Sequence, residues 1–276
     1  MREPVSLAYL LARASDTLAD TEGLDAELRR DMLHGFGDVM RGVDRVAWMD
    51  QINKEVIPCQ QHEGEIALLS HMDEIFDWLH ELEDGQRHGA ILKVMEHILH
   101  GQSLDIERFE LQQCGGLSED AELEEYCFLV AGCVGEFWTT IGNICLPEFS
   151  SMEADRLTQM GIRYGKGLQL INILRDLPSD LKAGRCYLPV SDPSDLDSMI
   201  SETSRWRAQA RHHLKEGHMY AQSLGSRRVR AATALPGLIG ENTLDLLDEA
   251  SWEVLKGGVK VTRPQVYRCA WQAFFV

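Results

Sequence analysis

The stretch GIRYGKGLQLINILRDLPSDL, residues 161–181, decides the fold class, because its polar residues repeat at helical spacing within an apolar sequence. Gln169, Asn172 and Asp176 lie three and four residues apart, which places their side chains on one stripe of an α-helix. Leucine and isoleucine surround this stripe, so we expect a helix that is buried on most sides. Pro178 removes a backbone donor and disfavours helical angles at the preceding residue. We therefore expect the helix to kink or end just past Asp176 and to point Asp180 in a new direction.

The rest of the chain follows the same helical pattern. Apolar residues recur at spacings of three and four in 24–40 and 66–82, whereas the period-two alternation of strands is scarce. Ser150 with Glu153, and Thr262 with Gln265, have the spacing of capping boxes at helix starts. There is no linker, repeat or low-complexity tract. These features predict one all-α domain of long helices across residues 1–276.

The amino-acid composition argues against some classes of function and cellular location. The formal net charge is -17, and so acidic a surface repels phosphate backbones, which argues against nucleic-acid binding. An anionic substrate would need a bound cation to bridge it to so acidic a protein. Seven cysteines without a CxxC pair favour a reducing compartment, and we expect a cytoplasmic protein. The most apolar stretch, 126–138, is short and contains Glu136, so we expect a buried core helix and no transmembrane segment.

A second polar stripe occurs near the start, in YLLARASDTLAD, residues 9–20. Tyr9, Arg13, Asp16 and Asp20 are spaced four, three and four apart on a largely apolar helix. Carboxylates at this spacing suit Mg²⁺, which prefers oxygen ligands. The chain has 44 acidic residues, so such pairs also arise by chance. We interpret another pair, within residues 73–77, as a solvated face.

Both stripes together predict a site for several Mg²⁺ ions. Asp16 and Asp20 would face the stripe of residues 169–176 across a helical bundle, with an anionic diphosphate bound through the metal. Three glycines, Gly161, Gly165 and Gly167, lie on the second helix, where each costs about 1 kcal/mol. They indicate either close helix packing or room for a bulky ligand.

A third segment, residues 124–138, allows two interpretations. Tyr126, Val130, Cys133 and Phe137 form one stripe with small residues beside it. The stripe suits an apolar channel for a hydrocarbon tail and a carbocation, which aromatic faces attract. It equally suits a packed core helix.

These three segments, in this order, resemble the squalene and phytoene synthase family of head-to-head prenyl transferases. The family implies the isoprenoid synthase fold, a single helical bundle around a central cavity. Residues 9–20 resemble its first aspartate motif, residues 169–189 its second motif, and residues 125–135 its tyrosine-bearing helix. SEDAELEEYCFLVAGCVG and KGGVKV look closer to squalene synthases than to phytoene synthases.

The resemblance implies condensation of two farnesyl diphosphates to presqualene diphosphate and NADPH-dependent reduction to squalene. It places Tyr126 as an aid to proton removal in the first half-reaction. By the same resemblance, the catalytic residues are Tyr126 and the four aspartates Asp16, Asp20, Asp176 and Asp180. The metal ligands are the same four aspartates together with Asn172. The substrate-binding residues are Arg13, Arg175, Gln169, Asn172, Arg185 and Tyr187, and the cofactor-binding residues are Tyr9, Asn172 and Lys260. Lys256, Lys260 and Arg263 form a basic cluster that suits a cofactor phosphate or consists of ordinary helix-end cations.

The sequence departs from the family pattern in two places. Ala19 and Ser179 stand where the family usually has an acid, so each motif has one carboxylate fewer. Only eight residues precede Tyr9, and we expect the chain to lack the family's first helix. Alternative functions are synthesis of dehydrosqualene or phytoene without NADPH, hydrolysis of farnesyl diphosphate to farnesol, and non-catalytic binding of a lipid or partner. Because the product is a hydrocarbon, we expect transient peripheral contact with a membrane.

Overall fold

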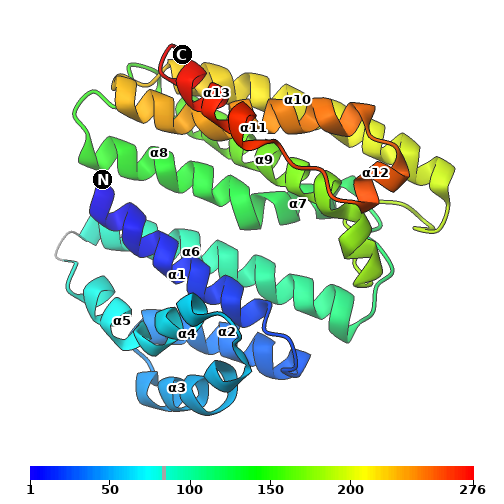
Figure 1. Ribbon diagram of the computed structural model, residues 1–276. Helices are drawn as coiled ribbons and strands as arrows, with labels where there is room; N and C mark the ends of the chain where they lie inside the picture. Colours follow the sequence, from blue (N-terminus) through cyan, green and yellow to red (C-terminus); the bar gives the residue numbers. More distant parts are fainter. Residues whose placement is uncertain (83–84) are drawn as a thin grey trace. The chain divides into compact units, whose positions relative to one another are not determined.

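The computed structural model describes residues 1–82 and 85–276, and these fold into helices that form two compact units (Figure 1). The first unit is Met1–Gln113 and the second is Cys114–Val276. Within the described residues, β pairing is confined to an isolated antiparallel bridge between Ser150 and Leu224. The predicted all-α class is confirmed, and a single domain across the chain stays a prediction.

The first unit is built around an aromatic cluster. Its elements are α1 (Arg2–Ala19), α2 (Ala26–Met40), α3 (Arg45–Gln51), π-helical η1 (Ile52–Val56), 3-10-helical η2 (Ile57–Cys59), α4 (Glu63–Ser70), α5 (Met72–His80), α6 (Gly85–Asp105) and π-helical η3 (Ile106–Leu111). Phe36, Trp48 and Phe76 pack edge to face, with ring centroids 5.4 to 5.5 Å apart. The indole of Trp48 donates to the carbonyl of Met32 at 2.9 Å, so burial leaves its polar atom bonded. Helix α1 packs on α6 in the same unit.

In the second unit, the long helix α9 is the centre of the packing. The elements are α7 (Asp120–Cys127), π-helical η4 (Phe128–Gly132), α8 (Cys133–Cys145), α9 (Ala154–Lys182), α10 (Leu196–Gln222), α11 (Arg227–Glu249), α12 (Trp252–Lys256) and α13 (Arg263–Ala273). Helix α9 packs against α8, α10 and α11, and Figure 1 shows it running among them. The polar stripe of residues 169–176 therefore lies on a helix that is held by three neighbouring helices.

Glycines bring η4 and α8 into backbone contact with α9. A Cβ atom on Gly135 would lie 1.9 Å from the carbonyl oxygen of Gly161, and one on Gly165 would lie 2.2 Å from that of Ala131. A Cβ on Gly167 would lie 2.7 Å from Cβ of His213, on α10. No side chain fits at these distances, so the glycines serve close packing. Of the two interpretations offered by the sequence, helix packing is confirmed.

The expected end of α9 just past Asp176 is wrong. The helix continues through Pro178 to Lys182. Gly184, with φ of +81°, ends it in a Schellman motif: its amide donates to Leu181, and the next amide, of Arg185, donates to the carbonyl of Asp180. Pro178 removes only one backbone bond near the end of a long, packed helix, which is too little to stop it. Asp180 therefore stays on the helix, one turn beyond Asp176, and the expected kink at Pro178 stays a prediction.

The start of α9 also differs from expectation. Glu153, not Ser150, caps the helix, and its carboxylate accepts from the amides of Asp155 and Arg156 at 2.9 and 2.8 Å. The hydroxyl of Ser150 instead donates to the carbonyl of Ser223 at 2.9 Å. The capping box predicted at the last helix is present.

The apolar segment 126–138 belongs to a longer helical stretch than the sequence indicated. Asp120–Cys145 runs for 26 residues, with a mean hydropathy of 1.3 in its most apolar window, of which 44% is buried. By length and composition alone it meets the requirements of a membrane-spanning helix, and the expectation of no transmembrane segment stays a prediction. Its glycine contacts with α9 are those of a packed core helix, and buried core helices often have the same length and apolar composition.

Candidate functional site

In the first unit, Asp16 of the first aspartate stripe lies in a largely buried position. The side-chain amide of Gln102, on α6, donates to Oδ1 of Asp16 at 2.6 Å. Burial, followed by the negative charge of Asp20, raises the pKa of Asp16, and the hydrogen bond from Gln102 and the charge of Arg13 only partly oppose this. A divalent cation at this pair would favour the ionised form and so oppose the shift.

The pair within residues 73–77 provides a direct contrast. Asp73 and Asp77 are exposed, and the guanidinium of Arg45 pairs with them at 2.7 Å each. These hydrogen bonds lower the pKa of Asp77 below its usual value. The interpretation of this pair as a solvated face is confirmed. Identical spacing thus yields a neutralised surface pair in one helix and a destabilised carboxylate in the other.

Arg13 and Tyr9 lie on the open side of α1. Arg13 forms an ion pair with Glu65 of α4 at 2.7 Å, and its side chain is 45% exposed. Tyr9 is 67% exposed. Although they lie on a largely apolar helix, these two residues are exposed and therefore accessible to a ligand.

In the second unit, arginines cover the aspartates of α9. Arg175 donates to both carboxylate oxygens of Asp176, at 2.8 and 2.5 Å, and Arg185 lies 3.6 Å from Asp180. The amide of Asn172 donates to Gln169 at 3.5 Å. Asn172 is exposed and Asp176 is half-buried, so the expected buried face is instead an accessible one.

Tyr126 lies beside the tail of the second motif. Its ring stacks on the ring of Tyr187 with centroids 4.8 Å apart and an interplanar angle of 18°. The amide of Leu117 donates to the carbonyl of Cys186 at 3.1 Å, which ties the segment before α7 to the same tail. The structure therefore brings together two predicted site residues that are 61 positions apart in the sequence.

The remainder of the third segment is core. Cys133 and Phe137 are buried, and burial raises the pKa of Cys133 to about 12. Burial likewise raises the pKa of Cys127, so neither thiol is an available nucleophile at neutral pH. The π-helical turn η4 lies between Tyr126 and these residues, so they do not share the single stripe that α-helical spacing indicated. The packed-core interpretation is confirmed for this part.

In the C-terminal basic cluster of Lys256, Lys260 and Arg263, one residue forms an ion pair within its own helix. Lys256 pairs with Glu253 at 3.1 Å, as helix-end lysines commonly do. Lys260 and Arg263 are exposed. Their assignment to a cofactor phosphate stays a prediction.

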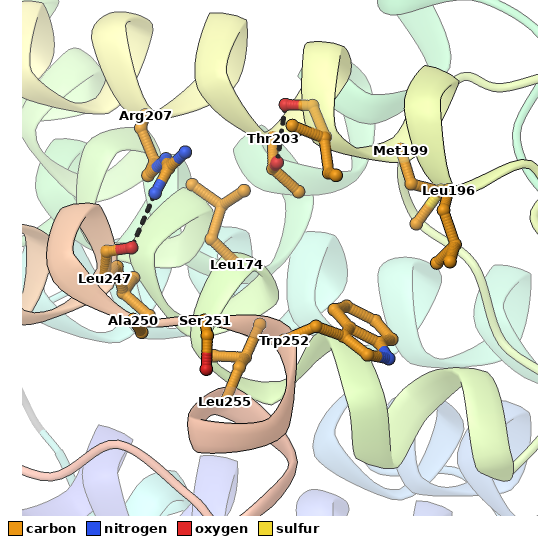
Figure 2. Close-up of a pocket in the computed structure, with 11 residues that line it drawn as sticks. Leu174, Leu196, Met199, Thr203, Arg207, Leu247, Ala250, Ser251, Trp252 and Leu255 are labelled. Carbon is orange, nitrogen blue, oxygen red and sulfur yellow. Dashed lines mark hydrogen bonds between the residues drawn. The ribbon is translucent and has the colours of Figure 1, made fainter.

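A cavity of about 280 Å³ lies elsewhere in the second unit, between α9, α10 and α12 (Figure 2). Leu174, Met199, Leu247 and Trp252 contribute to its apolar wall, and Arg207 donates to the carbonyl of Leu247 at its edge. On a helix, residue 174 points away from the stripe of residues 169, 172 and 176. The cavity is therefore separate from the polar face of α9.

The acidic residues fit Mg²⁺ as pairs and not as a closed cage. Among the described residues, no group of three or more His, Cys, Asp or Glu side chains is placed to hold a metal ion. Mg²⁺ is usually held by one or two carboxylates with water and substrate phosphates, which matches a pair on each helix. That the two pairs face each other stays a prediction, because each belongs to a unit described by itself.

Sequence reasoning missed Gln102. It follows Ile91, Met95 and Ile98 at spacings of four, three and four, so an amide takes a place in the buried stripe of α6. That exception to the apolar pattern is the signal that would have identified it.

Comparison with known proteins identifies the family. The squalene/phytoene synthase family model matches residues 1–265, which include both aspartate helices and Tyr126. The chain belongs to the squalene/phytoene synthase family. It is 26% identical over 276 residues to a squalene synthase of Gibberella zeae, covering 94% of this chain and 56% of that protein. It is also 26% identical over 237 residues to a bifunctional lycopene cyclase/phytoene synthase of Blakeslea trispora, covering 83% of this chain and 32% of that one.

A solved structure supports the fold of this family member. TcSQS in complex with a ligand superposes with a TM-score of 0.78 at 21% identity, over 98% of this chain and 78% of the other. The chain thus has the fold of that protein and spans little more than half the length of the Gibberella squalene synthase.

Proposed function

We propose that the chain catalyses Mg²⁺-dependent head-to-head condensation of two farnesyl diphosphates through presqualene diphosphate, followed by NADPH-dependent reduction to squalene. The observation that carries the proposal is the family match across residues 1–265, which contains both aspartate pairs and the tyrosine-bearing helix. The preference for squalene rests on the local resemblance of residues 118–135 and 256–261 to squalene synthases.

The aspartates of α1 and α9 would hold the metal ions. When bound, Mg²⁺ neutralises the diphosphate and makes it a better leaving group. Asp16 favours a cation because its burial and the charge of Asp20 destabilise its ionised form. Asn172 and Gln169 add amide oxygens on the accessible face of α9.

The arginines beside the aspartates would exchange partners on binding. Arg175 neutralises Asp176, and Arg185 lies close to Asp180. A metal ion competes for the same carboxylates, so the guanidinium groups are then able to turn to diphosphate oxygens, which they bind bidentately. Arg13, now paired with Glu65, would add a further cation from α1.

Tyr126 is the proposed participant in proton removal. Its ring is held by the stack on Tyr187, which orients the hydroxyl without a covalent constraint. The exposed Tyr9, Asn172 and Lys260 are the proposed contacts to NADPH, and Lys260 supplies a cation for a phosphate.

The test is product analysis by mass spectrometry after incubation with farnesyl diphosphate and Mg²⁺, with and without NADPH. We expect squalene only when NADPH is present, and loss of all products in the variant Asp16→Asn. The matched control is Asp77→Asn, which alters an aspartate pair of the same spacing on the surface. Dehydrosqualene under both conditions would reassign the reaction, farnesol alone would indicate a phosphatase, and a preference for a C20 substrate would indicate phytoene synthesis. Unchanged product formation in Asp16→Asn would refute the metal assignment.

A further inference from the structure

Helix α13 presents an unpartnered aromatic face. Tyr267, Trp271, Phe274 and Phe275 are 73%, 68%, 60% and 69% exposed. Their spacing of three and four residues places them on one side of the helix and the following turn. The opposite side is buried, because Ala273 packs into a small cluster with residues of α10 and α11. Four large rings on one solvent-facing side exceed the scattered exposure that is normal for surfaces.

The same part of the chain has a charge opposite to that of the whole. Residues 254–276 contain four Lys or Arg and no Asp or Glu, and residues 217–240 contain three Arg and no acid. The complete chain has 27 basic and 44 acidic residues, so these two stretches are exceptions to its acidity. Arg263 and Arg268 flank the aromatic face, one on each side by helical spacing.

Packing joins the two basic stretches. Helix α13 lies on α11, as Figure 1 shows, and Ala273 contacts the cluster that includes Ala231 and Ala234. Ala231 directly follows Arg230, so the first turn of α11, with Arg227 and Arg228, lies near the last turn of α13. The aromatic end of α13 is thus bordered by arginines that are distant in the sequence. On the buried side of α13, burial and, to a smaller extent, the negative charge of Glu241 on α11 raise the pKa of Cys269.

We propose that this surface, formed by α13 and the first turn of α11, docks on an anionic lipid membrane. Tryptophan, tyrosine and phenylalanine favour the boundary between headgroups and acyl chains. Arginines beside them match the negative charge of the headgroups, and their long side chains reach the headgroup level when the rings insert. A second copy of the chain is the alternative occupant, and dimerisation without lipid would reveal it. The proposal does not rest on the reaction catalysed.

The test is sedimentation of the full chain with vesicles of phosphatidylcholine alone and with vesicles of phosphatidylcholine and phosphatidylglycerol. We expect binding to the anionic vesicles, weakened by salt, with a blue shift of Trp271 fluorescence that is absent in Trp271→Phe. Each cation near an anionic surface contributes about fivefold in affinity, so Arg263→Gln/Arg268→Gln should bind about 25-fold more weakly. The charge control is Lys54→Gln/Lys215→Gln, which removes two exposed lysines elsewhere.

The aromatic contribution is tested with Trp271→Gln/Phe275→Gln. Both side chains are exposed, so the fold should survive, as circular dichroism would verify. We expect binding to anionic vesicles to fall at least tenfold, whereas Val46→Gln, which alters a residue that is 79% exposed on α3, leaves binding unchanged. No binding to anionic vesicles, equal binding by the aromatic variant, or a concentration-dependent dimer that shields Trp271 without lipid would each overturn the proposal.

Discussion

The contact between α8 and α9 makes Gly135→Ala a decisive perturbation. The added Cβ would lie 1.9 Å from the carbonyl oxygen and 2.5 Å from the carbonyl carbon of Gly161. Both atoms belong to the backbone of a packed helix and have no rotamer through which to move. The helices must separate by about 1 Å, and a gap of that size forfeits a quarter to a half of the dispersion energy at each contact along them.

The expected loss of stability follows from two opposing effects. Alanine gains about 1 kcal/mol over glycine in a helix interior. Overpacking costs about 1–3 kcal/mol and more where the backbone must shift, and the second close approach, Gly165 to Ala131, is disturbed as well. Because the clash is with backbone atoms, the upper end of this cost, about 3 kcal/mol, applies, and we expect a net loss of about 2 kcal/mol, or roughly 4–8 °C in the melting temperature.

The assay is urea and thermal denaturation followed by circular dichroism, with Gly89→Ala as control. Gly89 lies in α6, and a Cβ there meets nothing within 4 Å, so the control should gain about 0.5–1 kcal/mol. If Gly135→Ala were as stable as the control but bound farnesyl diphosphate poorly, the glycine would serve to leave room for a ligand. That result would refute the close-packing argument.

Three further predictions concern single sites. Because the pKa of Asp16 is raised in the folded state, Asp16 contributes stability at low pH that is lost as the pH rises through that pKa. Without metal, Asp16→Asn should therefore have a higher melting temperature than the parent protein near pH 7. A lower melting temperature at that pH would contradict burial and the charge of Asp20 as the cause. Tyr126→Phe should keep the ring stack on Tyr187, so its free energy of unfolding in urea should fall by no more than about 1 kcal/mol. Turnover should nevertheless fall at least about 100-fold. Full activity of this variant would exclude a role of the Tyr126 hydroxyl in proton transfer. Gly184→Ala should lower the free energy of unfolding by about 1–2 kcal/mol in the same urea denaturation, because a Cβ atom is disfavoured at a φ of +81°. An unchanged denaturation midpoint would argue against the Schellman motif at the end of α9.

Much of the candidate site was predictable because its signals are local. The spacing of the residues in the two polar stripes depends only on the pitch of a helix, and the sequence placed Asp16 correctly on α1 and Gln169, Asn172 and Asp176 correctly on α9, whereas Asp20 is the residue that caps the end of α1. The end of α9 was also encoded locally. Gly184 is the stronger stop signal, and the error lay in giving Pro178 more weight than a packed helix allows.

By itself, the sequence determined the helical class, the two polar stripes and the acidity of most of the chain. Only the tertiary structure decided which carboxylate is perturbed, since Gln102 reaches Asp16 from a helix 86 residues away. It likewise decided that Tyr126 stacks on Tyr187 and that the basic stretches of α11 and α13 adjoin. Helical periodicity is a property of neighbouring residues, whereas burial, and the contacts and pKa shifts that follow from it, depend on which distant segments pack together.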